Sequence, residues 1–193
     1  MSNTTGTPAT WVVVGASRGI GLEYVKQLLH AGNRVIATAR NPEASGLSKV
    51  IKAHGTPDSC IVEQCDVAIN LNPDSPPSKL IFISSDSGST TNFLAYEDGF
   101  AAYAASKAAL NQMLRHMAEE LKRRGGKWAE ICVLALHPGE VHTDMNSGEV
   151  GTWDVGTLLE PEESVSGMLK VISEKNHNDT GTFWCWDGRA YPW

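Results

Sequence analysis

The sequence predicts an α/β fold in which a doubly wound parallel sheet of about six strands is covered by helices on both faces. Short apolar runs alternate along the chain with longer segments of helical periodicity, which is typical of parallel strands joined by crossover helices. Glycine, proline or asparagine closes most of these segments, as expected at element ends. Because 193 residues suit one domain, we expect residues 1–193 to form a single domain.

The first half of the chain predicts strand, helix, strand, helix and strand. An apolar run ends at Gly15, and Gly32 stops the apolar periodicity of the helix that follows. In order, the predicted elements are a strand at 11–14, a helix from about 19, a strand at 34–39, a helix at 43–54 and a strand at 60–65. Residues 68–78 are rich in asparagine, aspartate, serine and proline. They show neither helical nor strand periodicity and are predicted to be a loop.

The second half continues the alternation. Its predicted elements are a strand at 80–84, a helix at 101–124, a strand at 130–136, a helix from about 161 and a strand at 182–186. The long helix ends at Gly125. Its expected buried face consists of residues at helical spacing, namely Leu110, Met113, Leu114, Met117 and Leu121.

Composition and charge exclude several classes of protein. The net charge is −6, and the short basic run at 122–124 is typical of a solvated helix end rather than a nucleic-acid surface. The polar first ten residues and the short apolar run at 11–14 indicate neither a signal peptide nor a membrane span. The four cysteines have no metal-binding spacing, so we expect reduced, buried thiols, no metal and a cytoplasmic protein.

A glycine loop at Gly15–Gly21 lies between the first predicted strand and helix, with Ser17, Arg18, Gly19 and Ile20 inside it. Such a turn lets backbone N–H groups and a helix N-terminus face a pyrophosphate, because no side chain blocks the approach. A structural turn is the alternative for a bare glycine cluster. The strand before it and the helix after it favour a dinucleotide site.

The choice of cofactor is indicated at the end of the second strand. An acidic residue there would accept the ribose hydroxyls of NAD, but the sequence has Arg40. Together with Arg18, Arg40 offers charge-assisted hydrogen bonds to a 2′-phosphate. Two surface arginines without this role remain the alternative. The pattern favours NADP(H) over NAD(H).

A tyrosine and a lysine lie four residues apart on the long helix and therefore share one face. The ammonium of Lys107 would favour the phenolate of Tyr103, and Tyr103 could then exchange a proton with a carbonyl or alcohol oxygen. Ser85, at the carboxyl end of a buried strand, could donate a hydrogen bond to the same oxygen. The spacing alone is a weak signal, and a turn cap is the alternative for Ser85.

A second loop, Pro138–Thr143, also follows a strand. After the turn at Pro138 and Gly139, the backbone at Val141 and the hydroxyl of Thr143 could meet the nicotinamide amide. His137 and His142 are set aside as acid–base groups, because neither has an evident partner in the sequence.

These residues together resemble the classical short-chain dehydrogenase/reductase family, whose fold is Rossmann-like. The matching motifs are Gly15-x-x-x-Gly19-Ile20-Gly21, Arg40, Asp66-Val67, Ile83-Ser84-Ser85, Tyr103-x-x-x-Lys107 and Pro138-Gly139-x-Val141-x-Thr143. The ending, 181–193, resembles carbonyl reductases of the sniffer and C-factor type. The resemblance implies that Ser85 positions a carbonyl, that Tyr103 is the acid and that Lys107 holds the nicotinamide ribose. It also implies that Asp66 binds the adenine amino group.

The sequence departs from the family between Asp66 and Ser85. Family members carry there a helix, a fourth strand with an Asn-Asn-Ala-Gly motif and a further helix with a catalytic asparagine, and this chain carries only residues 67–84. Without that strand, the first strand and the Ser85 strand either pair directly or leave a gap in the sheet. Asn111 cannot be assigned the missing asparagine's role by motif.

Three interpretations follow. The first is an NADP(H)-dependent oxidoreductase, monomeric or dimeric, that acts on a small carbonyl or alcohol; a short lid at 146–159 with Trp153 would cover the substrate. The second is a catalytically defective derivative with a binding or regulatory role. The third is a truncated gene product. Neither the substrate nor the persistence of activity can be read from these residues.

Overall fold

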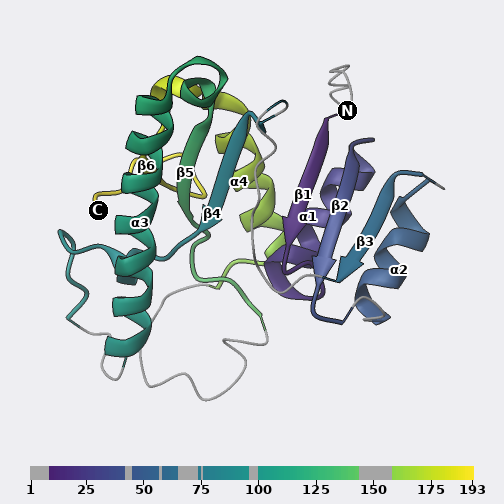
Figure 1. Cartoon of the computed structure of the whole chain (residues 1–193). Helices are drawn as coiled ribbons and strands as arrows, with labels where there is room; N and C mark the ends of the chain where they lie inside the picture. The colour runs from purple at the N-terminus through teal and green to yellow at the C-terminus, as the bar shows by residue number, and fades with distance from the viewer. Residues whose placement is uncertain are drawn as a thin grey trace. The chain divides into compact units, whose positions relative to one another are not determined.

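The computed structural model describes residues 9–41, 45–56, 58–64, 74, 76–95, 100–143 and 158–193. The chain divides into two compact units, residues 1–69 and 70–193. Each unit contains one three-stranded parallel sheet with helices packed on it (Figure 1). The predicted α/β class and the predicted parallel strands, six within the described residues, are confirmed. A single domain over 1–193 stays a prediction.

The first unit follows the predicted order closely. Its elements are β1 (Thr10–Val14), α1 (Gly19–His30), β2 (Arg34–Ala39), α2 (Ser45–His54) and β3 (Cys60–Gln64). The strands lie in the order β1-β2-β3, with Val12 opposite Ile36 and Ile36 opposite Ile61. The helices α1 and α2 lie on the same side of this sheet and contact each other (Figure 1).

The two faces of the first sheet differ in burial because side chains alternate along each strand. Val35 and Ala37 of β2 are buried, together with Val25 and Leu28 of α1. The opposite face carries apolar side chains that are exposed, at 61% for Val12, 44% for Val14 and 50% for Ile61. One face of the first sheet is therefore a packed core, and the other is open and apolar.

In the second unit, a helix packs on each face of the sheet (Figure 1). Its elements are β4 (Lys79–Ile83), η1 (Asp86–Gly88), α3 (Ala101–Arg124), η2 (Gly126–Glu130), β5 (Cys132–His137), α4 (Pro161–Glu174), η3 (His177–Asp179) and β6 (Thr182–Cys185). The strands lie in the order β4-β5-β6. The short helix η2 occupies part of the segment predicted as strand from residue 130, so β5 begins two residues later.

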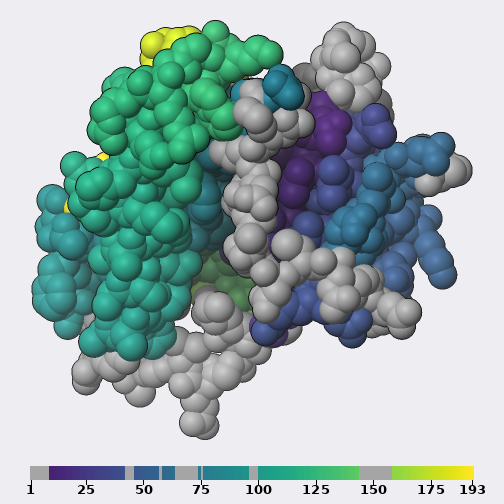
Figure 2. Space-filling model, in the orientation of Figure 1, coloured from purple at the N-terminus to yellow at the C-terminus, as the bar shows by residue number. Residues whose placement is uncertain are grey.

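The core of the second unit lies between α3 and the sheet. It consists of Leu114, Ala118, Leu121, Ile131, Val133, Ala135 and Phe183. The expected buried face of α3 was wrong at Met113, which is 49% exposed. Figure 2 shows one side of α3, in teal, open on the surface of the second unit. Asn111 takes a buried place on this helix instead.

Within its own unit, each of β1 and β4 lies at one edge of the three-stranded sheet. Cys132 and Cys185 are buried free thiols as predicted, whereas Cys60 is only half-buried, and Cys65 lies outside the described residues. No helix within the described ranges is long and apolar enough to cross a membrane.

Candidate functional site

The glycine loop of the first unit is fixed to the end of β2. The backbone N–H groups of Gly15 and Ala16 both donate to the carbonyl oxygen of Thr38, at 3.1 and 2.9 Å. Gly15 has φ +78°, in the left-handed region that favours glycine, and a Cβ there would meet open space. Glycine is therefore required at this position by the backbone conformation and not by close packing around the Cα atom.

The first turn of α1 packs directly on this loop. A Cβ on Gly21 would collide with the carbonyl oxygen of Gly15, so only glycine permits this approach. The helix begins at Gly19 with no side-chain cap and no acidic residue in its first turn. Its first N–H groups consequently keep their capacity to bind an anion.

Two arginines flank the loop as predicted. Arg18 lies immediately before α1, Arg40 immediately follows β2, and both side chains are exposed. An uncapped helix N-terminus can bind a phosphate, and an arginine near it can add a charge-assisted hydrogen bond. Asp66, the expected adenine contact, lies outside the described residues.

In the second unit, Tyr103 and Lys107 lie on one face of α3. Lys107 Nζ is 5.6 Å from the centre of the Tyr103 ring and donates a hydrogen bond to the carbonyl oxygen of Ile83, at 3.0 Å. Burial lowers the pKa of Lys107. The lysine therefore brings a partly desolvated ammonium both to the tyrosine and to the end of β4.

The serines that follow β4 are buried and differ in their partners. Ser84 Oγ donates to Asn111 Oδ1 at 2.5 Å, and Asn111 Nδ2 donates to the carbonyl oxygen of Gly88 at 3.1 Å. Ser85 Oγ lies 3.0 Å from Asp86 Oδ1, to which it donates. Ser84 thus anchors β4 to α3, and the hydroxyl of Ser85 is held beside a carboxylate.

The loop after β5 is rigidly packed. Gly139 has φ +78°, and a Cβ there would lie 2.5 Å from Leu159 Cδ1 and 2.8 Å from the Trp186 ring. Ser164 Oγ donates to the carbonyl oxygen of Pro138 at 2.6 Å. Val141 is buried and forms a bridge with Leu159. The predicted Pro138–Val141 segment therefore has one defined backbone path, and the half-buried Thr143 lies two residues beyond it.

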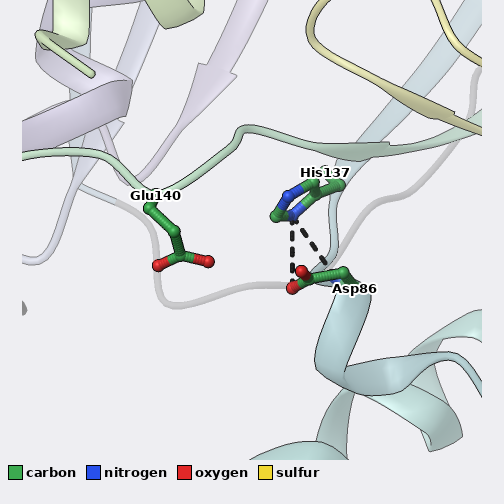
Figure 3. Close-up of side chains that lie close together, drawn as sticks. All are labelled: Asp86, His137 and Glu140. Atoms are coloured by element: carbon green, nitrogen blue, oxygen red, sulfur yellow. Dashed lines mark hydrogen bonds and ion pairs between the residues drawn. The ribbon is translucent and has the colours of Figure 1, made fainter. Parts of the chain in front are cut away.

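The expectation that His137 and His142 lack partners was wrong. His137 Nδ1 lies 3.3 Å from the backbone nitrogen of Asp86 and 3.5 Å from its Oδ1. His142 Nδ1 lies 3.9 Å from Glu160 Oε1, and both side chains are largely exposed. Figure 3 shows His137 with Asp86 and Glu140, whose ligand atoms all lie within 4.8 Å of one another.

The sequence missed this group because its members are distant in the chain. Asp86 and His137 are 51 residues apart, and only the parallel pairing of β4 with β5 brings the two strand ends to one edge. The motif Pro138-Gly139 points to a turn there but does not identify the side chains beside it. Trp153 and residues 144–157 of the expected lid lie outside the described residues.

The short chain dehydrogenase family model matches the chain in two segments, residues 9–73 and 73–152. The two segments meet within the stretch between Asp66 and Ser85 where the sequence departs from the motif order. The known family therefore accounts for the parts on both sides of that break.

Two curated relatives match this chain over half of its length or slightly more. An uncharacterized oxidoreductase of Schizosaccharomyces pombe is 36% identical over 124 residues, which are 59% of this chain and 46% of the relative. The C-signal protein of Myxococcus xanthus is 38% identical over 97 residues, 50% of this chain and 51% of its own length. The chain thus spans about half the length of the relatives that it matches best in identity.

A further S. pombe oxidoreductase is 26% identical over 257 aligned positions that take in 97% of this chain and 99% of the relative. This alignment is longer than the 193 residues of the chain, so the relative carries residues that this chain lacks. The absent residues agree with the missing strand and helices inferred from the motifs.

Solved carbonyl reductases share the fold. The NADPH-bound carbonyl reductase from chicken fatty liver is 24% identical with a TM-score of 0.72, covering 97% of this chain and 100% of that one. The carbonyl reductase Sniffer of Drosophila melanogaster is 20% identical with a TM-score of 0.72 and the same coverage. Both likenesses concern the fold.

Proposed function

Because the chain belongs to the short-chain dehydrogenase family, in its sniffer and C-factor branch, we propose that it is an NADP(H)-dependent oxidoreductase. Its substrate is a small carbonyl or alcohol. The observation that carries the proposal is the placement of Lys107, which lies beside the Tyr103 ring and is bonded to the end of β4 next to Ser84 and Ser85. These contacts support a site in which Tyr103 donates a proton, Lys107 supplies a positive charge and Ser85 supplies a hydroxyl.

The first unit supplies the cofactor site in this proposal. The pyrophosphate binds at the uncapped start of α1, where Gly15 and Gly21 leave the backbone accessible. Arg18 and Arg40 bind the 2′-phosphate that distinguishes NADP(H) from NAD(H). The chicken carbonyl reductase of similar fold binds NADPH, which supports the same choice.

The chemistry assigned to the second unit is proton transfer. The nicotinamide, when bound, supplies or accepts the hydride. Tyr103 gives its phenolic proton to the oxygen of the carbonyl during reduction and takes a proton from the alcohol during oxidation. Lys107 favours the ionised form of the phenol, and Ser85 holds the substrate oxygen by a hydrogen bond. Ser85 must exchange its bond to Asp86 for one to the substrate.

A second candidate is a catalytically defective derivative that retains a binding or regulatory role. The break of the family match at residue 73 favours it. A small displacement of reacting groups already costs much rate, about 100-fold for 1 Å. A chain that binds the cofactor without turning over a carbonyl would fit this second function.

The test has a binding step and a turnover step. Purified protein is titrated with NADPH and NADH by fluorescence, and NADPH oxidation is followed with small aromatic aldehydes such as 4-nitrobenzaldehyde. We expect NADPH to bind more tightly than NADH, and Arg40→Ala to lower that preference by roughly 10-fold. Arg123→Ala, which removes an exposed arginine from the end of α3, is the matched control.

Tyr103→Phe separates the two candidates. It should abolish turnover and leave NADPH affinity within about 3-fold, because the hydroxyl acts on the substrate oxygen. No binding at millimolar cofactor would rule out the enzyme. If the protein binds NADPH but shows no carbonyl turnover that Tyr103→Phe abolishes, the defective derivative is favoured.

A further inference from the structure

Three potential metal ligands converge at the carboxyl ends of β4 and β5. Asp86 is the first residue of η1, His137 is the last residue of β5, and Glu140 follows three residues later (Figure 3). One ligand atom from each lies within 4.8 Å of the others. The side chains of His137 and Asp86 are only 11% and 15% exposed. This group is half-buried, unlike an ordinary cluster of surface carboxylates.

The donor set suits a divalent transition metal. One imidazole nitrogen and two carboxylates are ligands that Zn²⁺ and Mn²⁺ both accept. Ligand atoms around one such ion, at about 2.1 Å from it, lie roughly 3.4 Å apart in a tetrahedral site. The separation between the ligand atoms is therefore about an ångström greater than it would be around a bound ion. Rotation of the Glu140 side chain can close this difference.

Electrostatics also favour a cation here. Asp86 and Glu140 bring two carboxylates into a partly desolvated space, where like charges repel more strongly than in water. Within the part of the chain that the structure describes, Asp86 has no ion pair with lysine or arginine; its partners are serine, backbone and His137. A bound cation would be attracted by both carboxylates.

The nitrogen of His137 that faces Asp86 is Nδ1, and it accepts a hydrogen bond from the backbone N–H of Asp86. The lone pair of Nδ1 therefore points toward Asp86, and an ion bound there replaces this hydrogen bond. The long 3.3 Å contact to the amide is a weak bond for a metal to replace.

The fold holds the two backbone segments in place without a metal. Trp186 N donates to the carbonyl oxygen of His137 at 2.9 Å, and Ser164 Oγ fixes Pro138. On the other strand, Ser84 N donates to the carbonyl oxygen of Leu136 at 2.7 Å. Because these bonds order the ligands' backbone in advance, less conformational entropy is lost when an ion binds.

We propose that Asp86, His137 and Glu140 form a binding site for one divalent transition metal ion, of which Zn²⁺ and Mn²⁺ are the best suited. Asp86 Oδ1 accepts the hydrogen bond of Ser85 Oγ, so an ion on that carboxylate weakens its hold on the serine. This effect on Ser85 rests on the proposed oxidoreductase function. Metal binding itself does not.

The test measures binding directly, with no cofactor or substrate present. Protein without a histidine tag is stripped with EDTA and titrated with Zn²⁺, Mn²⁺ or Mg²⁺ by calorimetry, and the bound metal is counted after dialysis. We expect one Zn²⁺ or Mn²⁺ per chain, with Mg²⁺ bound at least ~10-fold more weakly because it prefers oxygen ligands. A metal in 100-fold excess over its Kd should raise the unfolding temperature by a few degrees, about 3 °C or more.

Paired variants decide where the ion binds. Glu140→Gln and His137→Gln each keep the side-chain size and should weaken Zn²⁺ binding at least ~10-fold. The control exchanges the same residue types at an exposed neighbouring pair, His142→Gln with Glu160→Gln, and should leave the affinity unchanged.

Co²⁺ provides a second readout that does not depend on calorimetry. Its visible absorption should report nitrogen and oxygen ligands in the unmodified chain and should be lost in Glu140→Gln. The circular dichroism spectrum of each variant verifies folding. Absence of binding at 100 µM metal, binding indifferent to both ligand variants, or binding lost in the control pair would each overturn the metal site. None of these outcomes bears on NADPH binding by the first unit.

Discussion

The ammonium of Lys107 donates a hydrogen bond to the carbonyl oxygen of Ile83 at 3.0 Å and so joins the middle of α3 to the last residue of β4. Ser84 and Ser85 follow Ile83 directly. The lysine therefore has a structural contact at the strand that carries the proposed substrate-binding serine. The same ammonium lies 5.6 Å from the centre of the Tyr103 ring.

Replacing Lys107 with methionine should affect chemistry more than folding. The variant keeps the length of the side chain but loses the charge and one hydrogen bond, at a cost of about 1–3 kcal/mol in stability. Under the proposed function, kcat should fall at least ~100-fold, and the pH at which residual activity is half-maximal should rise, because no cation then favours the phenolate. Steady-state kinetics across pH measure both effects.

Lys122→Met is the control for Lys107→Met. Lys122 also lies on α3, but its side chain is 60% exposed and pairs with Glu119, so its loss should change stability by less than about 1 kcal/mol. An unchanged pH profile in Lys107→Met would contradict the electrostatic role of the ammonium and leave only the contact to Ile83.

Gly88 is required by the close packing of η1 on α3. A Cβ at this position would lie 2.7 Å from Lys107 Cβ and 2.8 Å from Lys107 C, and neither atom belongs to a flexible side-chain end. Gly88→Ala should therefore destabilise the protein by about 1–3 kcal/mol and displace Lys107. Chemical denaturation and the NADPH-dependent rate should both report the change.

Gly46→Ala supplies the comparison for Gly88→Ala. The new Cβ would meet the flexible end of the Leu22 side chain at 3.3 Å and the carbonyl oxygen of Ser17 at an ordinary 3.6 Å. Alanine also favours the helix by up to ~1 kcal/mol. We expect a neutral or stabilising effect. Equal destabilisation by the two substitutions would show that loss of glycine, rather than contact with Lys107, is responsible.

Asn111 connects two elements by hydrogen bonds inside the core. It is 3% exposed, accepts from Ser84 Oγ and donates to the carbonyl oxygen of Gly88. Asn111→Ala leaves the Ser84 hydroxyl and the Gly88 carbonyl buried without this partner. It should lower the free energy of unfolding by about 2–4 kcal/mol. In a double-mutant cycle with Ser84→Ala, the coupling should be at least ~0.5 kcal/mol. Additive effects would contradict a direct bond, and Gln112→Ala at the exposed neighbour should be nearly silent.

The predictable parts of the molecule are those fixed by local sequence. Apolar runs and glycine stops placed the strands β1 to β6 and the helices α1 to α4 to within a few residues, because hydrophobic periodicity reports which face of an element is buried. The short helices η1, η2 and η3 were not predicted. The Gly15–Gly21 loop and the pair Tyr103 and Lys107 were identifiable for the same reason. Each is a contiguous motif in which spacing sets the geometry.

Features that depend on distant contacts were not predictable. Met113 continues the apolar periodicity of α3, yet the helix turns Asn111 inward to bond with Ser84 and leaves Met113 exposed. His137 finds Asp86 only through strand pairing across 51 residues. The motif order predicts a stretch lacking between Asp66 and Ser85, but local periodicity does not report which distant strands pair, such as β4 with β5.

Tyr24 provides a test of burial in the first unit. Its hydroxyl is buried without a hydrogen-bond partner among the described residues, and burial strongly raises its pKa. A raised folded-state pKa contributes stability that is fully present below the unfolded value of about 10 and is lost as the pH rises beyond it. The phenol must stay neutral for the unit to remain folded.

Tyr24→Phe should therefore act in two pH ranges. At pH 7 it removes an unpaired polar group, so we expect stabilisation of about 1–2 kcal/mol and an unfolding temperature higher by roughly 2–6 °C. Above pH 10 the unmodified protein should lose stability more steeply than the variant, and thermal unfolding from pH 7 to 11 would measure the difference.

Tyr191→Phe is the matched control. The Tyr191 hydroxyl has a hydrogen bond with Asn92, so removing this hydroxyl should not stabilise the protein. A Tyr24→Phe variant that is less stable at pH 7 would show that the hydroxyl has a partner after all.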